Sequence, residues 1–177
     1  MPASVRNALR ASLAEAGVLA RLGDALFDPA NWHQSLTPEL SDNPDLRRRL
    51  SAACARLSET PAATITFDRI RGTRDRNGHV HWTVLPSRTP ASFEALDAAL
   101  HAALDTEDIV AYCRRHPHVT VSYRAPREMP ATRIPPVTWV IDGVELVSPG
   151  GSPYRYRTLG RWTLREPSPG CQLALPV

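Results

Sequence analysis

Two short segments of the chain repeat one pattern of chemically useful side chains. Each consists of a histidine, any residue, a hydroxyl residue and an aliphatic residue: His33-Gln34-Ser35-Leu36 and His118-Val119-Thr120-Val121. An imidazole titrates near neutral pH and can act as general base or general acid, while a hydroxyl can donate a hydrogen bond to an anionic oxygen. One such tetrad would carry no weight, but two of them predict a shared site suited to phosphoryl chemistry.

Both tetrads are predicted to lie on short strands, and this fixes where their side chains point. Because side chains alternate between the two faces of a strand, His33 and Ser35 should share a face. The same parity places His118, Thr120 and Arg124 on one face of the second strand. If the two strands lie side by side or across a cleft, two imidazoles and two hydroxyls meet. Arg124 could then neutralise charge that develops on a phosphate.

The other potential ligands for a metal are not spaced as a metal site requires. His79 and His81 are two apart on a predicted strand, but we find no carboxylate or cysteine at ligand spacing beside them. The three cysteines, Cys54, Cys113 and Cys171, form no CxxC pair. This spacing argues against both a disulfide framework and a structural zinc site. We therefore expect chemistry without a metal or another cofactor.

The composition narrows the class of protein. The chain has 177 residues, of which 42% are hydrophobic and 22% charged, which is typical of one folded domain and not of a disordered or membrane-spanning chain. All 21 Lys and Arg positions are arginine, against 18 Asp and Glu. The net charge of +3 permits contact with nucleic acid without requiring it. The N-terminal segment lacks the apolar stretch of a signal peptide, so we expect a cytoplasmic protein.

Hydrophobic periodicity predicts the elements that must position the tetrads. Helices are expected over residues 4–16, 18–26, from Pro44 to before Pro61, from Pro90 through Leu104, and between Thr106 and Pro117. Strands are expected over residues 31–37, 63–71, 79–85, 118–124, 137–148 and 154–164. The segments 63–71 and 79–85 form a hairpin with a long polar loop. Asp142-Gly143 marks either a tight hairpin or a bulge in one long strand.

Helices and strands interleave along the chain, but hairpins make antiparallel pairing more favourable than a wound parallel sheet. We therefore predict an α+β fold with two lobes of antiparallel sheet, helices outside and a central cleft. No Gly-, Ser- or Pro-rich linker divides the chain, so residues 1–177 should form a single domain whose two lobes are tightly joined.

With these motifs in this order, the chain resembles the two-histidine (2H) phosphoesterases, which include the bacterial 2′-5′ RNA ligase, or RNA 2′,3′-cyclic phosphodiesterase (LigT-like), group. The two tetrads correspond to the family's H-x-[ST]-φ motifs, and the similarity extends over about residues 4–164. The family usually has a strand before its first helix, whereas this sequence begins almost directly in the helix. Members of the family often have an arginine five residues after the second histidine. In this chain that position is Tyr123, and Arg124 follows it. Ser35 stands where threonine is common.

The resemblance implies a function and a set of site residues. The expected reaction is metal-independent hydrolysis of a 2′,3′-cyclic phosphate, on an RNA end or a nucleotide, to a 2′-phosphate. His33 and His118 would be catalytic, with His33 resembling the acid and His118 the base, although the sequence itself does not assign these roles. Ser35, Thr120, Arg124 and Tyr123 would bind the substrate. Tyr123 or Trp32 could border a nucleobase.

Three alternatives stay open at this stage. The same residues would serve a 2′-5′ RNA ligase or the opening of another cyclic phosphodiester. The chain could also be a binding module that has the same cleft and binds phosphate or a nucleotide without turnover. A structural or interaction protein with accidental tetrads would hold its two histidines far apart.

Overall fold

The structure is a computed structural model, and it describes residues 1–111 and 116–166. Its α-helices are α1 (Ala3–Glu15), α2 (Val18–Leu22), α3 (Pro44–Ala55) and α4 (Ala91–Thr106). Its 3₁₀ turns are η1 (Gly23–Ala25), η2 (Pro29–Asn31) and η3 (Arg56–Glu59). Its strands are β1 (Ala63–Arg74), β2 (Val80–Leu85), β3 (Val119–Ser122), β4 (Met129–Ile141), β5 (Gly143–Gly150) and β6 (Arg155–Thr163).

The described strands form two antiparallel sheets. One has the order β3-β2-β1-β4, and the other pairs β5 with β6. The chain changes sheets at Asp142, because β4 ends at Ile141 beside β1 and β5 begins at Gly143 beside β6. The Asp142-Gly143 step is therefore neither a hairpin nor a bulge within one ladder, and it connects the two sheets.

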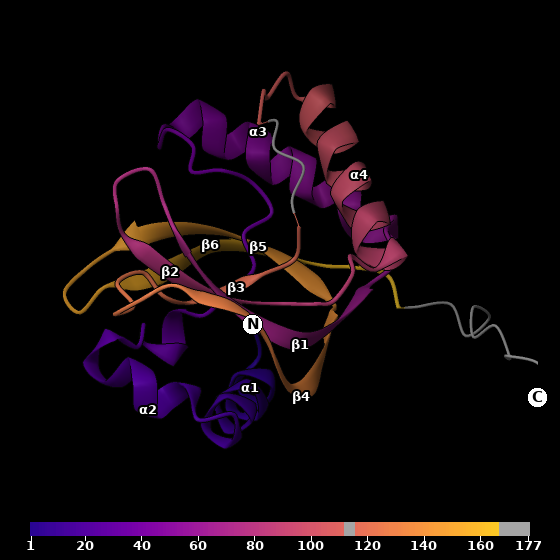
Figure 1. Ribbon diagram of the computed structural model, residues 1–177. Coiled ribbons are helices and arrows are strands. Elements are labelled where there is room, and N and C mark those ends of the chain that lie inside the picture. The colour runs from indigo at the N-terminus through magenta and orange to yellow at the C-terminus, as the bar shows by residue number, and fades with distance from the viewer. Residues whose placement is uncertain (112–115, 167–177) are drawn as a thin grey trace, which may run out of the picture.

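The helices lie on the outside of the sheets (Figure 1). Helix α1 packs on β4, while α4 packs on β1 and α3 packs on α4 and approaches β5 and β6. In Figure 1 the pair α1 and α2 therefore lies on the opposite side from the pair α3 and α4. The predicted α+β class, with antiparallel sheets and outer helices, is confirmed. No helix in the described part of the chain is long and apolar enough to span a membrane.

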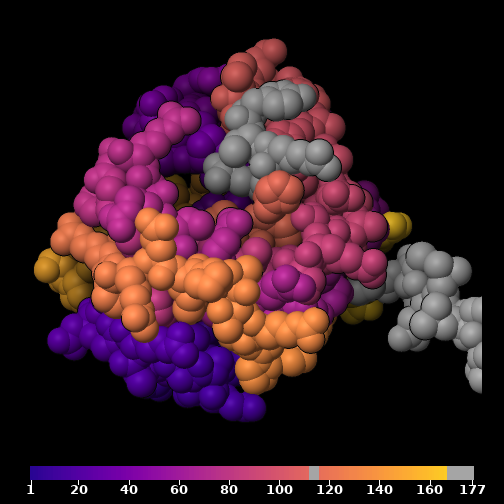
Figure 2. Space-filling view, viewed as in Figure 1, coloured from indigo at the N-terminus to yellow at the C-terminus, as the bar shows by residue number. Residues whose placement is uncertain are grey.

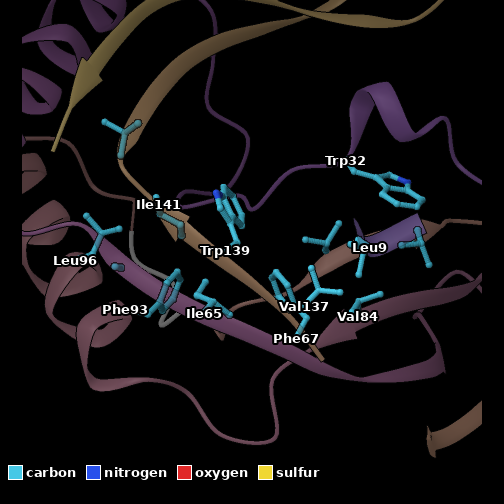
Figure 3. Packing of buried hydrophobic residues seen from close by; sticks show 14 of the residues in the cluster. Leu9, Trp32, Ile65, Phe67, Val84, Phe93, Leu96, Val137, Trp139 and Ile141 are labelled. Atoms are coloured by element: carbon cyan, nitrogen blue, oxygen red, sulfur yellow. The ribbon is translucent and has the colours of Figure 1, made fainter. Parts of the chain in front are cut away.

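A continuous hydrophobic core joins these layers (Figure 3). Ile65 and Phe67 of β1 are fully buried, and the alternating side chains of that strand are exposed, as the sequence pattern predicted. Figure 3 shows Phe93 of α4 close to Ile65, and Val137 of β4 close to Phe67. Trp32, 1% exposed, is also part of this core, so its indole is not available as a surface for a nucleobase.

The local signals at the ends of the elements explain most of their bounds. The Asn43 side chain accepts a hydrogen bond from the Leu46 amide at 2.8 Å and so caps α3 directly before Pro44. The β1–β2 loop is shorter than predicted because Asp75 accepts bonds from the amides of Asn77 and His79 at 2.8 and 2.9 Å and closes a tight turn.

Gly72, which was expected in that loop, lies inside β1 instead. A Cβ atom at this position would lie 2.5 Å from the indole nitrogen of Trp82 on the neighbouring strand. The glycine is therefore needed for close packing of β1 on β2, and not for a turn.

Four local predictions were wrong. The segment 31–37 is extended at Trp32 but forms no strand. Thr106 ends α4 and caps no further helix over residues 107–111; the rest of that predicted helix falls largely outside the described residues. Strand β3 ends at Ser122, short of Arg124, and Ser122 itself is fully buried. Strand β4 begins at Met129, well before the predicted residue 137.

Candidate active site

The first tetrad is positioned by a loop that side chains hold in place. The turn η2 precedes it and is capped by Asp28, whose carboxylate accepts from the Ala30 amide at 2.8 Å. The buried Trp32 donates from its indole nitrogen to the Phe27 carbonyl at 2.9 Å. The buried Asn31 donates from its side chain to the Tyr154 carbonyl at 3.1 Å. This segment is thus fixed without strand pairing.

The His33 ring is oriented by two hydrogen bonds. Its Nδ1 lies 2.7 Å from the Asn31 carbonyl oxygen, and because a carbonyl can only accept, Nδ1 carries the proton. In the neutral ring Nε2 is then an acceptor, and the Ser35 hydroxyl lies 3.1 Å from it. The ring also makes an edge contact with Tyr156 of β6, with 4.7 Å between centroids.

His118 is anchored in the same way at the start of β3. Its Nδ1 lies 2.9 Å from the His116 carbonyl oxygen, so this ring too donates from Nδ1 to the carbonyl two residues upstream. Both imidazoles are half-buried, and in each the Nδ1 bond directs Nε2 away from the carbonyl, toward the Ser35 hydroxyl in the case of His33. The two tetrads share this local geometry although only the second leads into a strand.

The Gln34 side chain joins the two tetrads. The Gln34 side-chain oxygen accepts from the His118 backbone amide at 2.5 Å, and its amide nitrogen donates to the Ser35 carbonyl at 2.7 Å. Just upstream, the Phe27 amide donates to the Val121 carbonyl of β3 at 2.8 Å. Two segments far apart in sequence are thus in direct contact at their motif residues.

The electrostatics of His33 reflect this contact. Burial lowers the pKa of His33 below its ordinary value. The positive charges of the N-terminal amino group and of His118 lower the pKa further, while the hydrogen bond to the Asn31 carbonyl opposes the shift. The positive charge of His118 is therefore felt at His33, and burial favours the neutral form of the His33 ring.

One tyrosine, Tyr156, contacts the His33 ring, and two more lie next to motif residues or to Tyr156. The Tyr123 phenol hydrogen-bonds to the Thr120 hydroxyl, and burial raises its pKa. Burial also raises the pKa of Tyr156, which hydrogen-bonds to Tyr154. Sequence reasoning identified Tyr123 but missed the other two. The signal for them was weak: two aromatic residues two apart at the start of a predicted strand.

The remaining predicted binding residues occupy different positions. Ser35 lies beside His33, and Thr120 is half-buried in β3 and faces Tyr123. Arg124 is exposed beyond the end of β3, and within the described residues its guanidinium makes no hydrogen bond or ion pair. Strand parity no longer applies at Arg124, because β3 ends at Ser122.

His79 and His81 have a carboxylate beside them, contrary to expectation. The Asp75 carboxylate lies 3.8 Å from His79 and 3.3 Å from His81. His81 also packs edge-on against Tyr123, with 5.2 Å between ring centroids. Over residues 1–111 and 116–166 no group of three histidine, cysteine or carboxylate side chains is arranged to hold a metal ion.

The surface is hollowed among the elements that carry these residues. In the space-filling view an opening lies between α3, the β1–β2 hairpin and β3, with β5 and β6 behind it (Figure 2). The tetrad loop contacts both sides of this region, through Gln34 to the start of β3 and through His33 to β6. Two imidazoles anchored through Nδ1, with the Ser35 and Thr120 hydroxyls in the same motifs, form an arrangement suited to a phosphate group.

Comparison with known proteins agrees with this fold and these motifs. The model of the 2′-5′ RNA ligase superfamily matches residues 25–153, and the chain belongs to this superfamily. The tetrads that resembled 2H phosphoesterase motifs both lie within the matched range. No curated protein sequence is significantly similar to the chain.

Solved structures share the fold at low identity. Escherichia coli LigT in apo form is 20% identical with a TM-score of 0.70, over 93% of this chain and 92% of that one. LigT complexed with 3′-AMP is 19% identical with a TM-score of 0.66, over 93% of both chains. TT0787 of Thermus thermophilus is 23% identical with a TM-score of 0.60, over 94% of both. At this identity these matches establish the architecture alone.

Proposed function

We propose that this chain hydrolyses 2′,3′-cyclic phosphates, on RNA ends or nucleotides, to 2′-phosphates by paired-histidine acid/base catalysis that needs no metal ion. One observation carries the proposal: two imidazoles from remote segments are anchored by identical Nδ1 bonds, and their motifs are tied together by Gln34. His118 Nε2 is thereby left for proton transfer, and His33 Nε2 becomes free for it when the Ser35 hydroxyl turns from the ring to the phosphate.

The proton transfers follow from the state of each ring. Burial lowers the pKa of His33, which favours the neutral ring that a general base requires. We assign His33 Nε2 as the acceptor of a proton from the attacking water. The water oxygen forms a bond to phosphorus, the bond from phosphorus to O3′ breaks, and protonated His118 Nε2 gives its proton to O3′. This reverses the roles that the family resemblance implied.

The hydroxyl groups would stabilise the charge on phosphate. Ser35 lies beside the His33 ring and Thr120 lies two residues beyond His118, so each can donate to a non-bridging oxygen while the phosphorus becomes five-coordinate. Arg124 is exposed and is proposed only as a long-range counter-charge. E. coli LigT complexed with 3′-AMP supports a ligand of nucleotide size for this fold.

The test is product analysis in the presence of EDTA. Wild-type protein is incubated with 2′,3′-cyclic AMP, and ³¹P NMR follows the loss of the cyclic phosphate. The proposal expects 2′-AMP as the product. The control variant is Ser51→Ala on α3, because the Ser51 hydroxyl donates to the Arg47 carbonyl, and its rate should equal that of wild type. A 3′-AMP product, or turnover that EDTA abolishes, contradicts the proposal.

Two further outcomes identify the alternatives. Joining of paired RNA halves that carry a 2′,3′-cyclic phosphate and a 5′-hydroxyl, without hydrolysis of the cyclic nucleotide, would assign a 2′-5′ RNA ligase. Tight binding of 2′,3′-cyclic AMP with no product over a day would indicate a non-catalytic nucleotide-binding module. Either result replaces the proposed hydrolysis.

A further inference from the structure

The turn between β1 and β2 carries a carboxylate and two histidines that the proposed chemistry does not use. Asp75 accepts hydrogen bonds from the amides of Asn77 and His79 at 2.8 and 2.9 Å, so the backbone of the turn holds its carboxylate. Desolvation would raise the pKa of Asp75, but these bonds and the charges of His79 and His81 lower it below its ordinary value. The turn therefore presents a negative charge at a fixed place.

The two histidines differ in how they use this charge. His81 Nε2 lies 3.3 Å from the Asp75 carboxylate, whereas His79 Nδ1 lies 3.8 Å from it. The side chain of His79 is 55% exposed and that of His81 is 31% exposed. The His81 ring also packs edge to face on Tyr123, with 5.2 Å between centroids. An imidazole that contacts both a carboxylate and an aromatic ring has little freedom to rotate.

Tyr123 carries this constraint to the second tetrad. Its phenol hydrogen-bonds to the Thr120 hydroxyl, and its ring packs edge to face on Phe27 at 5.0 Å between centroids. The Phe27 amide donates to the Val121 carbonyl, which fixes Phe27 against β3. Because Tyr123 lies beyond the end of β3, strand pairing does not hold it, and the contacts with Phe27 and His81 do so instead.

The register of the sheet places His81 on the face that carries the Thr120 hydroxyl. Thr83 of β2 is paired with Thr120 of β3, and residues directly opposite each other in an antiparallel pair point to the same face. His81 is two residues from Thr83 and shares this face, whereas the buried Trp82 between them points to the core. The contacts from the turn to Thr120 therefore run along one side of the sheet.

The Thr120 hydroxyl has a single proton, so its other hydrogen bond decides whether that proton is available to a phosphate oxygen. Burial raises the pKa of Tyr123, so the phenol keeps its own proton and can donate it to Thr120. We propose that His81 is a positioning residue that holds the Tyr123 phenol against the Thr120 hydroxyl, and that Asp75 orients His81 for this role. Thr120 is then free to donate to the phosphate, and His81 itself takes no part in proton transfer.

This inference rests on the proposed function for the identity of the phosphate site, and kinetics on 2′,3′-cyclic AMP give its first test. His81→Ala should lower kcat by about 10-fold and leave KM within about 2-fold, because a donor to phosphate is worth most when charge develops on the oxygens. Added to Thr120→Val, the same change should cost no more than about a further 2-fold, since the hydroxyl that it positions is already absent. Losses that multiply in the double variant would overturn the proposal.

Two matched variants separate this role from the stability of the turn. His79→Ala removes the other neighbour of the Asp75 carboxylate and should keep the wild-type rate. His81→Phe retains a ring against Tyr123 and should restore kcat to within about 3-fold of wild type. An equal loss in His79→Ala and His81→Ala, or a loss in His81→Phe as large as in His81→Ala, would contradict the positioning role.

The contribution of the carboxylate is measured against the same ring. Asp75→Asn keeps an oxygen for the amides of the turn and removes the charge that faces His81. It should lower kcat by about 3-fold in the wild-type chain and have no effect in His81→Phe, whose ring forms no ion pair. An equal loss in both backgrounds would show that Asp75 does not act through His81.

The second readout is binding of inorganic phosphate, which does not depend on turnover. Thr120→Val and His81→Ala should each weaken binding by about 5-fold, and the double variant should bind about as weakly as either alone. If wild type hydrolyses no cyclic phosphate but shows this pattern, the proposed hydrolysis fails and the positioning role stands. If wild type hydrolyses 2′,3′-cyclic AMP but the two losses in binding multiply, the positioning role fails and the proposed hydrolysis stands.

Discussion

The two histidine segments reach the same local geometry by different routes. His118 stands directly before β3, which pairs with β2, and the flanking Val119 and Val121 are fully buried. His33 lies in a loop with no strand partner. Hydrogen bonds from the buried Trp32 and Asn31 side chains hold this loop in place of the backbone hydrogen bonds of a strand pair. In both, Nδ1 is bonded to the carbonyl two residues upstream. The shared requirement is thus an anchored Nδ1, and a strand is only one way to provide it.

The two routes also differ in how they treat charge. Burial lowers the pKa of His33, and the charge of His118 lowers it further. The loop therefore favours the neutral form of His33, and this suits the role of general base proposed for it. The variants below either remove the difference between the two histidine segments or measure it.

The largest expected effect comes from changing the leaving group. Catechol cyclic phosphate expels a phenolate that leaves without protonation, so a missing general acid matters little on it. His118→Ala should lose about 10³-fold in kcat on 2′,3′-cyclic AMP and recover most of that loss on the catechol substrate. His33→Ala should stay impaired on both.

Initial rates for the two variants on both substrates check this assignment. The opposite pattern, with recovery in His33→Ala alone, would exchange the roles of the two histidines and contradict the reading of His33 as the base.

The next effect concerns the hydroxyls. Removing one donor to the phosphate should lower kcat by about 10²-fold, as for other oxyanion donors. Ser35→Ala also removes the partner of His33 Nε2, so it should affect the pH profile of kcat/KM, whereas Thr120→Val should lower the rate without moving that profile. Steady-state rates over pH 5 to 9 measure both. Identical profiles in the two variants would show that the Ser35 contact is not used.

A smaller effect is expected at the link between the two regions. Gln34→Ala removes the acceptor for the His118 amide and the donor to the Ser35 carbonyl, which leaves two polar groups without partners. Both motifs lose a fixed neighbour, so kcat/KM should fall by about 10-fold, while Ser51→Ala stays unchanged. Wild-type kcat/KM in Gln34→Ala would mean that the two tetrads are positioned independently of each other.

The smallest effect is on pH-dependent stability. The pKa of His33 is lowered in the folded protein from an ordinary value of about 6.5. Just below pH 6.5 the unfolded chain therefore binds more protons, and the free energy of unfolding falls as the pH falls. The contribution of neutral His33 to the free energy of unfolding is complete above pH 6.5, and it is lost as the pH falls to the pKa that His33 has in the folded protein. An NMR titration of the His33 ring should give a midpoint below 6.5. A midpoint above it contradicts the burial argument.

The tetrads and most elements were predictable because their signals are local. The helices α1 and α4 and the strand β1 were predicted from patterns that depend only on neighbouring residues, and all three are present. The histidine pattern likewise indicated the superfamily to which the chain belongs.

What was missed depends on contacts between distant segments. Gln34 is the variable position of its tetrad, yet its side chain reaches the second motif. The loop around His33 has strand-like composition, but whether such a segment pairs depends on a free sheet edge nearby, which no local pattern encodes. The strand carrying Arg124 was predicted too long, because β3 ends at Ser122. The contact of Tyr156 with His33, and of Tyr154 with Tyr156, follows from the folded arrangement of β6 and the residue before it.

The central claim is that His33 and His118 act as one unit on one phosphate, and a double-mutant cycle in kcat/KM on 2′,3′-cyclic AMP tests it most directly. His33→Ala and His118→Ala, each verified as folded by circular dichroism, should lose about 10³-fold, and the double variant should be no more than about 10-fold worse than either. Near-wild-type turnover in either single variant, or losses that multiply in the double variant, would contradict the account.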